Sequence, residues 1–258
     1  MHPMKNSKRL TKEQRAARDA LARLLANREE ADRSYNSLAE SHGGRIISTD
    51  LVRFLDARYR DTPKGSPRDL TPSWDLAWRY AQDRLNREIK NRRKRRAVRF
   101  MAGGWGAGKT HALQHAPMAD LSWDGTLSDP RKARRTIDLA LANGWRVEIA
   151  YVFRDIELAI YGAVERAKTE GRSVPLSELP ASHRAVQISI RKLLRRYRDN
   201  AQVAFMLVHN TGAKGIRGVP LFFTEAELAP GGALYYSLRY ESYYAEAARE
   251  IQALNAQS

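Results

Sequence analysis

The chain of 258 residues contains no cysteine. Disulfide bonds and thiolate metal sites are therefore excluded, and the composition fits a reducing compartment. The six histidines are scattered, without the spacing typical of metal ligands. Long apolar runs are also missing: no window approaches the roughly eighteen apolar residues of a membrane-spanning helix, and the first residues, MHPMK, lack the apolar stretch of a secretory signal. We therefore expect a cytoplasmic protein with no membrane partner.

Acidic residues are in short supply. Asp and Glu number 29 against 45 Lys and Arg, which gives a formal net charge of +16. This excess favours anionic partners such as nucleotides, phosphorylated metabolites or nucleic acid. The densest basic run is Arg92-Arg93-Lys94-Arg95-Arg96, at the end of a helix predicted from Trp74. We interpret it as a solvated helix end, because no aromatic residue interleaves to stack bases; a patch that neutralises nucleic-acid phosphates is the alternative.

One glycine-rich run stands between an apolar stretch of strand length and a helix predicted from Lys109 to His115. The run is Gly103-Gly104-Trp105-Gly106-Ala107-Gly108-Lys109-Thr110. In such a phosphate-binding loop, backbone N–H groups surround a phosphate, Lys109 reaches the β- and γ-phosphates, and the Thr110 hydroxyl holds Mg²⁺. The loop therefore predicts binding of a nucleoside triphosphate with Mg²⁺. A mere glycine-rich turn is disfavoured, because the glycines, Lys and Thr all fall in register between strand and helix.

Strands and helices alternate after the loop. Asp129-Pro130 is a helix start and Asn143-Gly144 a helix stop, while Gly171 ends a second predicted helix. Further strands are predicted at 119–123, 145–153 and 202–209, and helices at 130–143, 155–171 and 182–196. The alternation predicts an α/β fold, with a parallel sheet flanked by helices and functional residues where the strands end.

The N-terminal third differs in character. Leu10 to Asp32 is predicted as one charged amphipathic helix. Residues 45–50 form a small predicted strand that ends in a carboxylate, Asp50, and a short helical stretch follows it. Residues 61–72, rich in Pro, Gly and Ser, are predicted as a loop. From Leu234 to the end of the chain, tyrosines at near-helical spacing predict a helix that packs on the domain.

Several motifs now occur in a specific order: the phosphate loop, Asp124-Gly125-Thr126, Tyr151-Val152-Phe153-Arg154-Asp155, Glu165-Arg166 and Gly171-Arg172-Ser173-Val174-Pro175. Together, over about residues 97–210, they resemble the zeta toxin family of P-loop kinases. The resemblance implies a P-loop NTPase fold of the nucleotide-kinase type that uses ATP and Mg²⁺. It also implies phosphorylation of a hydroxyl on a nucleotide-linked small metabolite, similar to UDP-N-acetylglucosamine or NAD. Some members are toxins, so an antitoxin or chaperone is an implied partner.

The chain departs from the family in one respect. The family's acidic strand and catalytic Asp normally come after the phosphate loop and well before the Gly-Thr motif, but here only fifteen residues separate Lys109 from Asp124. A similar stretch lies upstream, from Ile46 to Arg53, with Tyr59 behind it. We therefore predict a rearranged order in which Asp50 returns to the active site from the N-terminal side.

Phosphoryl transfer to a hydroxyl needs a carboxylate that takes the acceptor proton and cations that meet the transferring group. Asp50 is the first choice for the base. Asp124 is the second, with binding of the metal as its other role. Helix capping is the alternative for Asp50 and a turn role the alternative for Asp124.

Arginine side chains supply the cations. The resemblance implies phosphate contacts for Arg166 and Arg172, whose guanidinium groups match phosphate oxygens. Arg154, Arg53 and Thr126 are weaker candidates for substrate contacts. In a chain so rich in arginine, a solvated surface position is the alternative for any of them.

These observations divide the chain into three parts. Residues 1–40 form an N-terminal helical segment, residues 41–224 the P-loop kinase domain, with an acidic segment at 41–60 and a core at 97–210, and residues 225–258 the C-terminal helix. A nucleic-acid-directed ATPase or polynucleotide kinase is the second functional hypothesis, because of the net charge and the run at 92–96. A nucleotide-binding protein without catalysis is the third.

Overall fold

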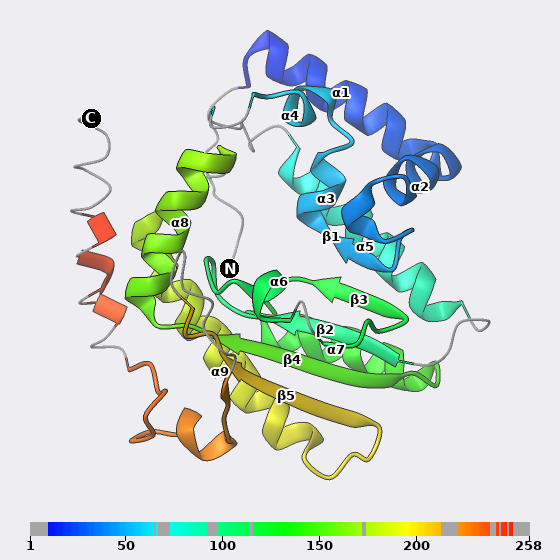
Figure 1. Ribbon diagram of the computed structural model, residues 1–258. Helices are drawn as coiled ribbons and strands as arrows, with labels where there is room; N and C mark the ends of the chain where they lie inside the picture. The colour runs from blue at the N-terminus through cyan, green and yellow to red at the C-terminus, as the bar shows by residue number, and fades with distance from the viewer. Residues whose placement is uncertain are drawn as a thin grey trace.

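The computed structural model describes residues 10–63, 66, 73–91, 97–113, 116–171, 174–212, 221–237, 241–242, 244–246 and 248–249. Within these residues the strands form one sheet in the order β1-β3-β2-β4-β5-β6 (Figure 1). The strands are β1 (Ile46–Ser48), β2 (Ala97–Ala102), β3 (Leu121–Asp124), β4 (Arg146–Phe153), β5 (Val203–His209) and β6 (Leu221–Phe222). Strands β1 to β5 pair in parallel, and β6 pairs antiparallel with β5. The predicted α/β fold with a parallel sheet is confirmed.

Helices connect and flank the strands. They are α1 (Lys12–Ala26), α2 (Arg28–Asn36), α3 (Thr49–Arg53), α4 (Ala57–Arg60), α5 (Trp74–Lys90), α6 (Lys109–Ala112), α7 (Pro130–Ala142), α8 (Ile156–Glu170) and α9 (Leu179–Tyr197), with short 3₁₀ turns at Ala39–Ser41, Leu176–Glu178 and Glu225–Leu228. Local signals set several of the ends. The Asp129 carboxylate accepts two backbone N–H groups at the start of α7. Gly171, at φ 68°, ends α8 in the left-handed conformation that favours glycine.

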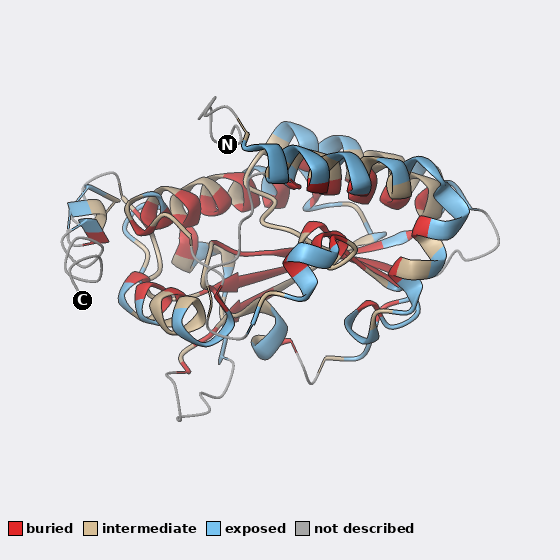
Figure 2. Ribbon diagram, turned by 90° about the horizontal axis from the view of Figure 1, so that it is seen from above, coloured by how far each residue is buried: buried red, intermediate tan, exposed pale blue. Residues whose placement is uncertain are grey.

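The two faces of the sheet carry different cores. Phe100, Ile149 and Tyr151 are completely buried on the face that packs against α5, α7 and α9, where most of the apolar core lies. Figure 1 shows α7 and α9 behind the sheet, and Figure 2 shows that the buried residues line the strands and the inward sides of the helices. Side chains alternate along a strand, so the neighbouring residues Met101 and Ala150 point to the other face and pack around the phosphate loop. The core therefore fixes the sheet as a platform for the loop.

The acidic segment upstream of the loop joins the sheet. β1 precedes β2 in sequence but lies beyond β3, where Ser48 is level with Asp124. Helix α5 then packs on α3 and returns the chain to β2. Because parallel strands end at one edge of a sheet, Asp50, Asp124 and the phosphate loop share the carboxyl edge, as the rearranged order requires.

Helices α1 and α2 correct the prediction of a single helix from Leu10 to Asp32. Asn27 interrupts it, because its backbone N–H closes α1 on the Leu24 carbonyl while its side chain accepts the Glu30 N–H at the start of α2. The first helix is joined to α5 by the bidentate pair of Arg18 and Asp75, at 2.5 and 2.7 Å. The break lets the two helices cover α5 at different angles (Figure 1).

The ends of other predicted elements also shift. The helix after the loop stops at Ala112, and residues 229–237 are not helical, so the described part of the C-terminal helix begins at 241. The basic run at 92–96, Arg172 and most of the predicted loop at 61–72 lie outside the described residues. Among the described helices, none combines the length and apolar character that a membrane crossing needs.

Candidate active site

The phosphate loop, residues 103–110, follows the central strand β2 and leads into α6. Two positions show why glycine is required. Gly106 has φ 73°, and a Cβ there would lie 2.5 Å from the carbonyl oxygen of Ala159 on α8. A Cβ on Gly104 would lie 2.2 Å from the His183 ring of α9. The loop is thus wedged between two helices, and its glycines allow the close approach.

Three consecutive carbonyl groups of the loop are held by side chains outside it. Trp105 O bonds to His183 Nε2 at 2.8 Å, Gly106 O to Arg154 Nη1 at 3.0 Å, and Ala107 O to Asn210 Nδ2 at 2.9 Å. In a trans peptide the carbonyl and the next N–H point in opposite directions. The N–H groups of Gly106 and Gly108 therefore point away from the side chains that bind the carbonyls of Trp105 and Ala107. This fits a loop preorganised for a triphosphate.

Burial lowers the pKa of two of these side chains. It lowers the pKa of His183 to about 4, so the imidazole is neutral at neutral pH. Its Nε2 must carry the proton, because a carbonyl oxygen only accepts. Burial also lowers the pKa of Arg154, although the guanidinium remains charged near neutral pH. Arg154 also donates to Gly212 O at 2.7 Å, so it places a fixed positive charge beside the loop.

Lys109, near the end of the loop, lies close to Asp124, at the end of β3. Lys109 Nζ lies 4.0 Å from Asp124 Oδ1, and the two side chains are 17% and 28% exposed. Thr110, the next residue, is exposed. An ammonium, a hydroxyl and a carboxylate are the groups that a triphosphate with Mg²⁺ requires at this position, so the residues present fit ATP and Mg²⁺.

Asp50 lies at the same edge of the sheet, one strand further out. Its backbone N–H donates to the Ser48 side chain at 3.2 Å, so Ser48 fills the cap of α3 that the alternative interpretation gave to Asp50. The Asp50 carboxylate is 40% exposed and accepts from Arg53 Nη1 at 3.1 Å. The Arg53 side chain is 3% exposed and lies 4.4 Å from the centre of the Trp74 ring. Arg53 thus holds an accessible carboxylate.

The remaining predicted residues differ in how close they lie to the loop. Thr126 borders the loop, because its carbonyl accepts from Gly103 N at 3.4 Å. Arg166 is on α8, seven residues and about two turns beyond Ala159, and so on the face that meets the loop. Its guanidinium pairs with Glu170 at 3.0 Å rather than with the loop. Arg172 lies outside the described residues.

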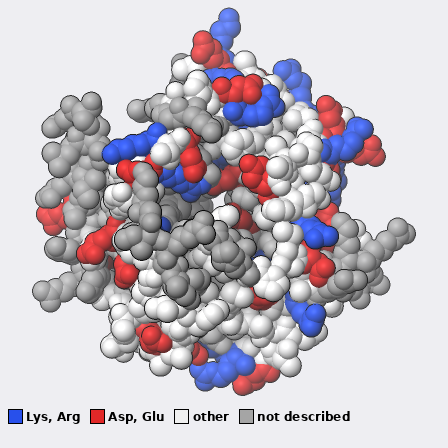
Figure 3. Space-filling model, in the orientation of Figure 1, with Lys and Arg blue, Asp and Glu red and all other residues white. Residues whose placement is uncertain are grey.

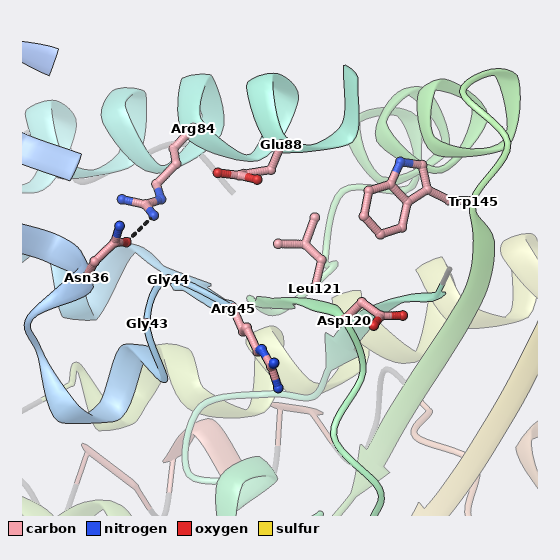
Figure 4. A pocket seen from close by; sticks show the side chains of 9 residues that line it. All are labelled: Asn36, Gly43, Gly44, Arg45, Arg84, Glu88, Asp120, Leu121 and Trp145. Carbon is pink, nitrogen blue, oxygen red and sulfur yellow. Dashed lines mark hydrogen bonds between the residues drawn. The ribbon is translucent and has the colours of Figure 1, made fainter. Parts of the chain in front are cut away.

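A small pocket of about 60 Å³ lies at the opposite edge of the sheet (Figure 4). Arg84 and Glu88 of α5 line one side, and Leu121, at the start of β3, lines the other. Arg84 is fixed there by Asn36 at 2.5 Å. Since the phosphate loop is at the carboxyl edge, this pocket is not part of the candidate active site.

Comparison with known families now adds to this geometry. Residues 113–214 match the model of the zeta toxin family. The match supports a P-loop kinase-like domain similar to the zeta toxin family over this part of the chain. The matched region begins after Thr110, so the phosphate loop and the acidic segment rest on their own motif and geometry. A search of curated proteins finds no match to the chain.

Two residues that hold the phosphate loop are absent from the sequence predictions. Asn210 directly follows β5, so the rule that functional residues lie where strands end would have indicated it. His183 lies in an amphipathic helix, and only its burial, at 2% exposed, distinguishes it from a surface histidine. No local sequence pattern gives that burial.

Proposed function

We propose that the chain is an ATP-dependent kinase that phosphorylates a hydroxyl of a nucleotide-linked small metabolite, similar to UDP-N-acetylglucosamine or NAD. The observation that carries the proposal is the loop whose three carbonyls are bound by side chains from outside it, with Lys109 and Asp124 close to each other at its end. The zeta toxin domain supports ATP-dependent phosphotransfer. The acceptor class, a toxic activity and an antitoxin or chaperone partner extend that support and belong to the proposal.

In the proposed reaction Lys109 would bind the β- and γ-phosphate oxygens, and Thr110 and Asp124 would hold Mg²⁺. Bound Mg²⁺ would neutralise phosphate charge and orient the γ-phosphoryl group. The acceptor hydroxyl gives its proton to a carboxylate, its oxygen bonds to the γ-phosphorus, and the bond to the β-phosphate oxygen breaks to release ADP. Arg154, with Arg166 and Arg172 as implied by the family, would balance the charge of the transferring group.

Asp50 is the proposed base. It is more exposed than Asp124, and Arg53 orients it, whereas Asp124 lies within 4.0 Å of Lys109 and is better placed for the metal. We expect Asp50→Asn to lower kcat by about 10²–10⁴-fold with little change in ATP affinity. Asp124→Asn should instead weaken the binding of Mg²⁺. Full activity in both variants would show that neither carboxylate is the base.

The experiment is transfer of γ-labelled phosphate from ATP with Mg²⁺ into separate pools of UDP-N-acetylglucosamine, NAD⁺ and a polynucleotide. Lys109→Ala is the control, since it removes the ammonium and leaves the glycines in place. Label in a small-molecule pool that the variant loses would support the proposal. Label in the polynucleotide alone, or release of phosphate with no labelled acceptor, would contradict it.

The second candidate is a nucleic-acid-directed ATPase or polynucleotide kinase. Two neighbouring helices, α7 and α9, and the residue that caps the end of α9 expose cations that this function would use: Arg131, Lys132, Arg134, Arg135, Lys192, Arg195, Arg196 and Arg198. Two of these cations, Arg134 and Arg196, pair with Asp138, and elsewhere cations and acids are interspersed, as on the face in Figure 3. This candidate predicts polynucleotide binding whose affinity falls steeply with salt. Absence of binding at physiological salt would exclude it.

A further inference from the structure

The segment of residues 225–237, here called the C-terminal strap, lies against α9 (orange in Figure 1). Gln187 of α9 binds it through both atoms of its side-chain amide. Gln187 Nε2 donates to Leu234 O at 2.6 Å, and Tyr236 N donates to Gln187 Oε1 at 2.8 Å. Gln187 is 2% exposed and Leu228 of the strap is completely buried. These buried contacts fix the strap in one position.

Tyr236 connects the strap to the residues that hold the phosphate loop. Its hydroxyl donates to the backbone carbonyl of Arg154. Its ring stacks on Phe153, with centroids 5.1 Å apart, and meets the His183 ring edge-on at 6.0 Å. Tyr236 therefore contacts both Arg154 and His183, whose side chains bind the carbonyls of Gly106 and Trp105.

We propose that the strap is a brace for the nucleotide loop and that Tyr236 is the positioning residue through which it acts. The proposal rests on the proposed function in one respect, that the loop binds ATP. Tyr236 restricts the His183 ring and the backbone of Arg154, so the loop keeps its outward carbonyls before a nucleotide arrives. Without Tyr236, ordering the loop would oppose binding, because its conformational entropy would be lost at that step.

The chain offers a matched control. Tyr244 follows the strap, and its hydroxyl donates to Glu157 of α8 at 2.7 Å. Tyr236→Phe and Tyr244→Phe therefore each remove one hydroxyl that binds the body of the protein. The Tyr236 hydroxyl bonds to the backbone of Arg154, a residue that holds the loop, whereas the Tyr244 hydroxyl bonds to Glu157 of α8. Gln187→Ala releases the strap, including the backbone N–H of Tyr236, and leaves the Tyr236 side chain unchanged.

The experiment measures the Kd of Mg·ATP by calorimetry and the Tm of each full-length variant. We expect Tyr236→Phe and Gln187→Ala to raise the Kd by about three- to tenfold, as the loss of a hydrogen bond predicts, and Tyr244→Phe to stay within about twofold. An unchanged Kd with a lower Tm in the first two would show a merely structural role and overturn the brace. Equal weakening by Tyr244→Phe would overturn it too. If the wild type binds no Mg·ATP, the proposed function fails. If the wild type binds Mg·ATP and only the brace prediction fails, the proposed function still stands.

Discussion

Acid is expected to destabilise the fold through His183. Burial beneath the nucleotide loop lowers the pKa of this imidazole to about 4, whereas in an unfolded chain it titrates near about 6.5. Between these values the unfolded state binds a proton that the folded state does not. The free energy of unfolding therefore falls as the pH falls from about 6.5 to about 4, and the stabilisation is fully present above that range.

The size of the effect follows from the two pKa values. Each pKa unit corresponds to about 1.4 kcal/mol, so the whole loss is about 3 kcal/mol below pH 4. At pH 5 it has reached about 2 kcal/mol. This is a large part of the roughly 5–15 kcal/mol that stabilises an ordinary domain.

The test compares wild type with His183→Gln by urea unfolding at pH 7, 6 and 5. The Gln side-chain amide can donate to Trp105 O but does not titrate, so the variant keeps the donor and loses the proton uptake. Between pH 7 and pH 5 the wild type should lose about 2 kcal/mol more than the variant. The other titrating groups are common to both proteins and cancel in the comparison. Equal losses in the two proteins would refute the reasoning.

Three further substitutions test the site and the core. Gly104→Ala places a Cβ where the His183 ring lies and should weaken Mg·ATP binding at least tenfold by calorimetry; unchanged affinity would contradict the wedged loop. Asn210→Ala leaves the Ala107 carbonyl without its donor and should weaken binding by about 1–2 kcal/mol, or about 5–30-fold, while full affinity would mean that this contact is dispensable. Leu193→Ala, in the core of α9, should lower the free energy of unfolding by about 2–5 kcal/mol and leave the Kd unchanged; a large change in Kd would show that core packing reaches the loop.

Local signals account for the parts of the fold that can be predicted from sequence. The apolar run before Gly103, the cap at Asp129 and the stop at Gly171 each act over a few residues, and the structure places β2, α7 and α8 accordingly. The break at Asn27 shows the limit of such signals. The periodic pattern continues through it, but the Asn27 backbone N–H closes α1 on Leu24 O and its side chain accepts from Glu30 N to begin α2.

Long-range packing decides the strand order and the residues that hold the loop, which local sequence signals do not determine. Nothing in the local pattern of Ile46–Ser48 places β1 beside β3, since sheet order depends on how α5 returns the chain to β2. The side chains that hold the loop come from α9 and from the ends of β4 and β5, about 45 to 105 residues away in sequence. The motif alone predicts phosphate contact, but these distant residues hold the loop in its shape.

The most direct test of the account is calorimetric titration of Mg·ATP into wild type and Lys109→Ala. A preformed loop predicts saturable binding by the wild type and affinity at least tenfold weaker in the variant, because a charge-assisted hydrogen bond contributes about 1.5–3 kcal/mol. Absence of saturable binding by the wild type, or equal affinity in the two proteins, would contradict the assignment of residues 103–110 as the nucleotide site.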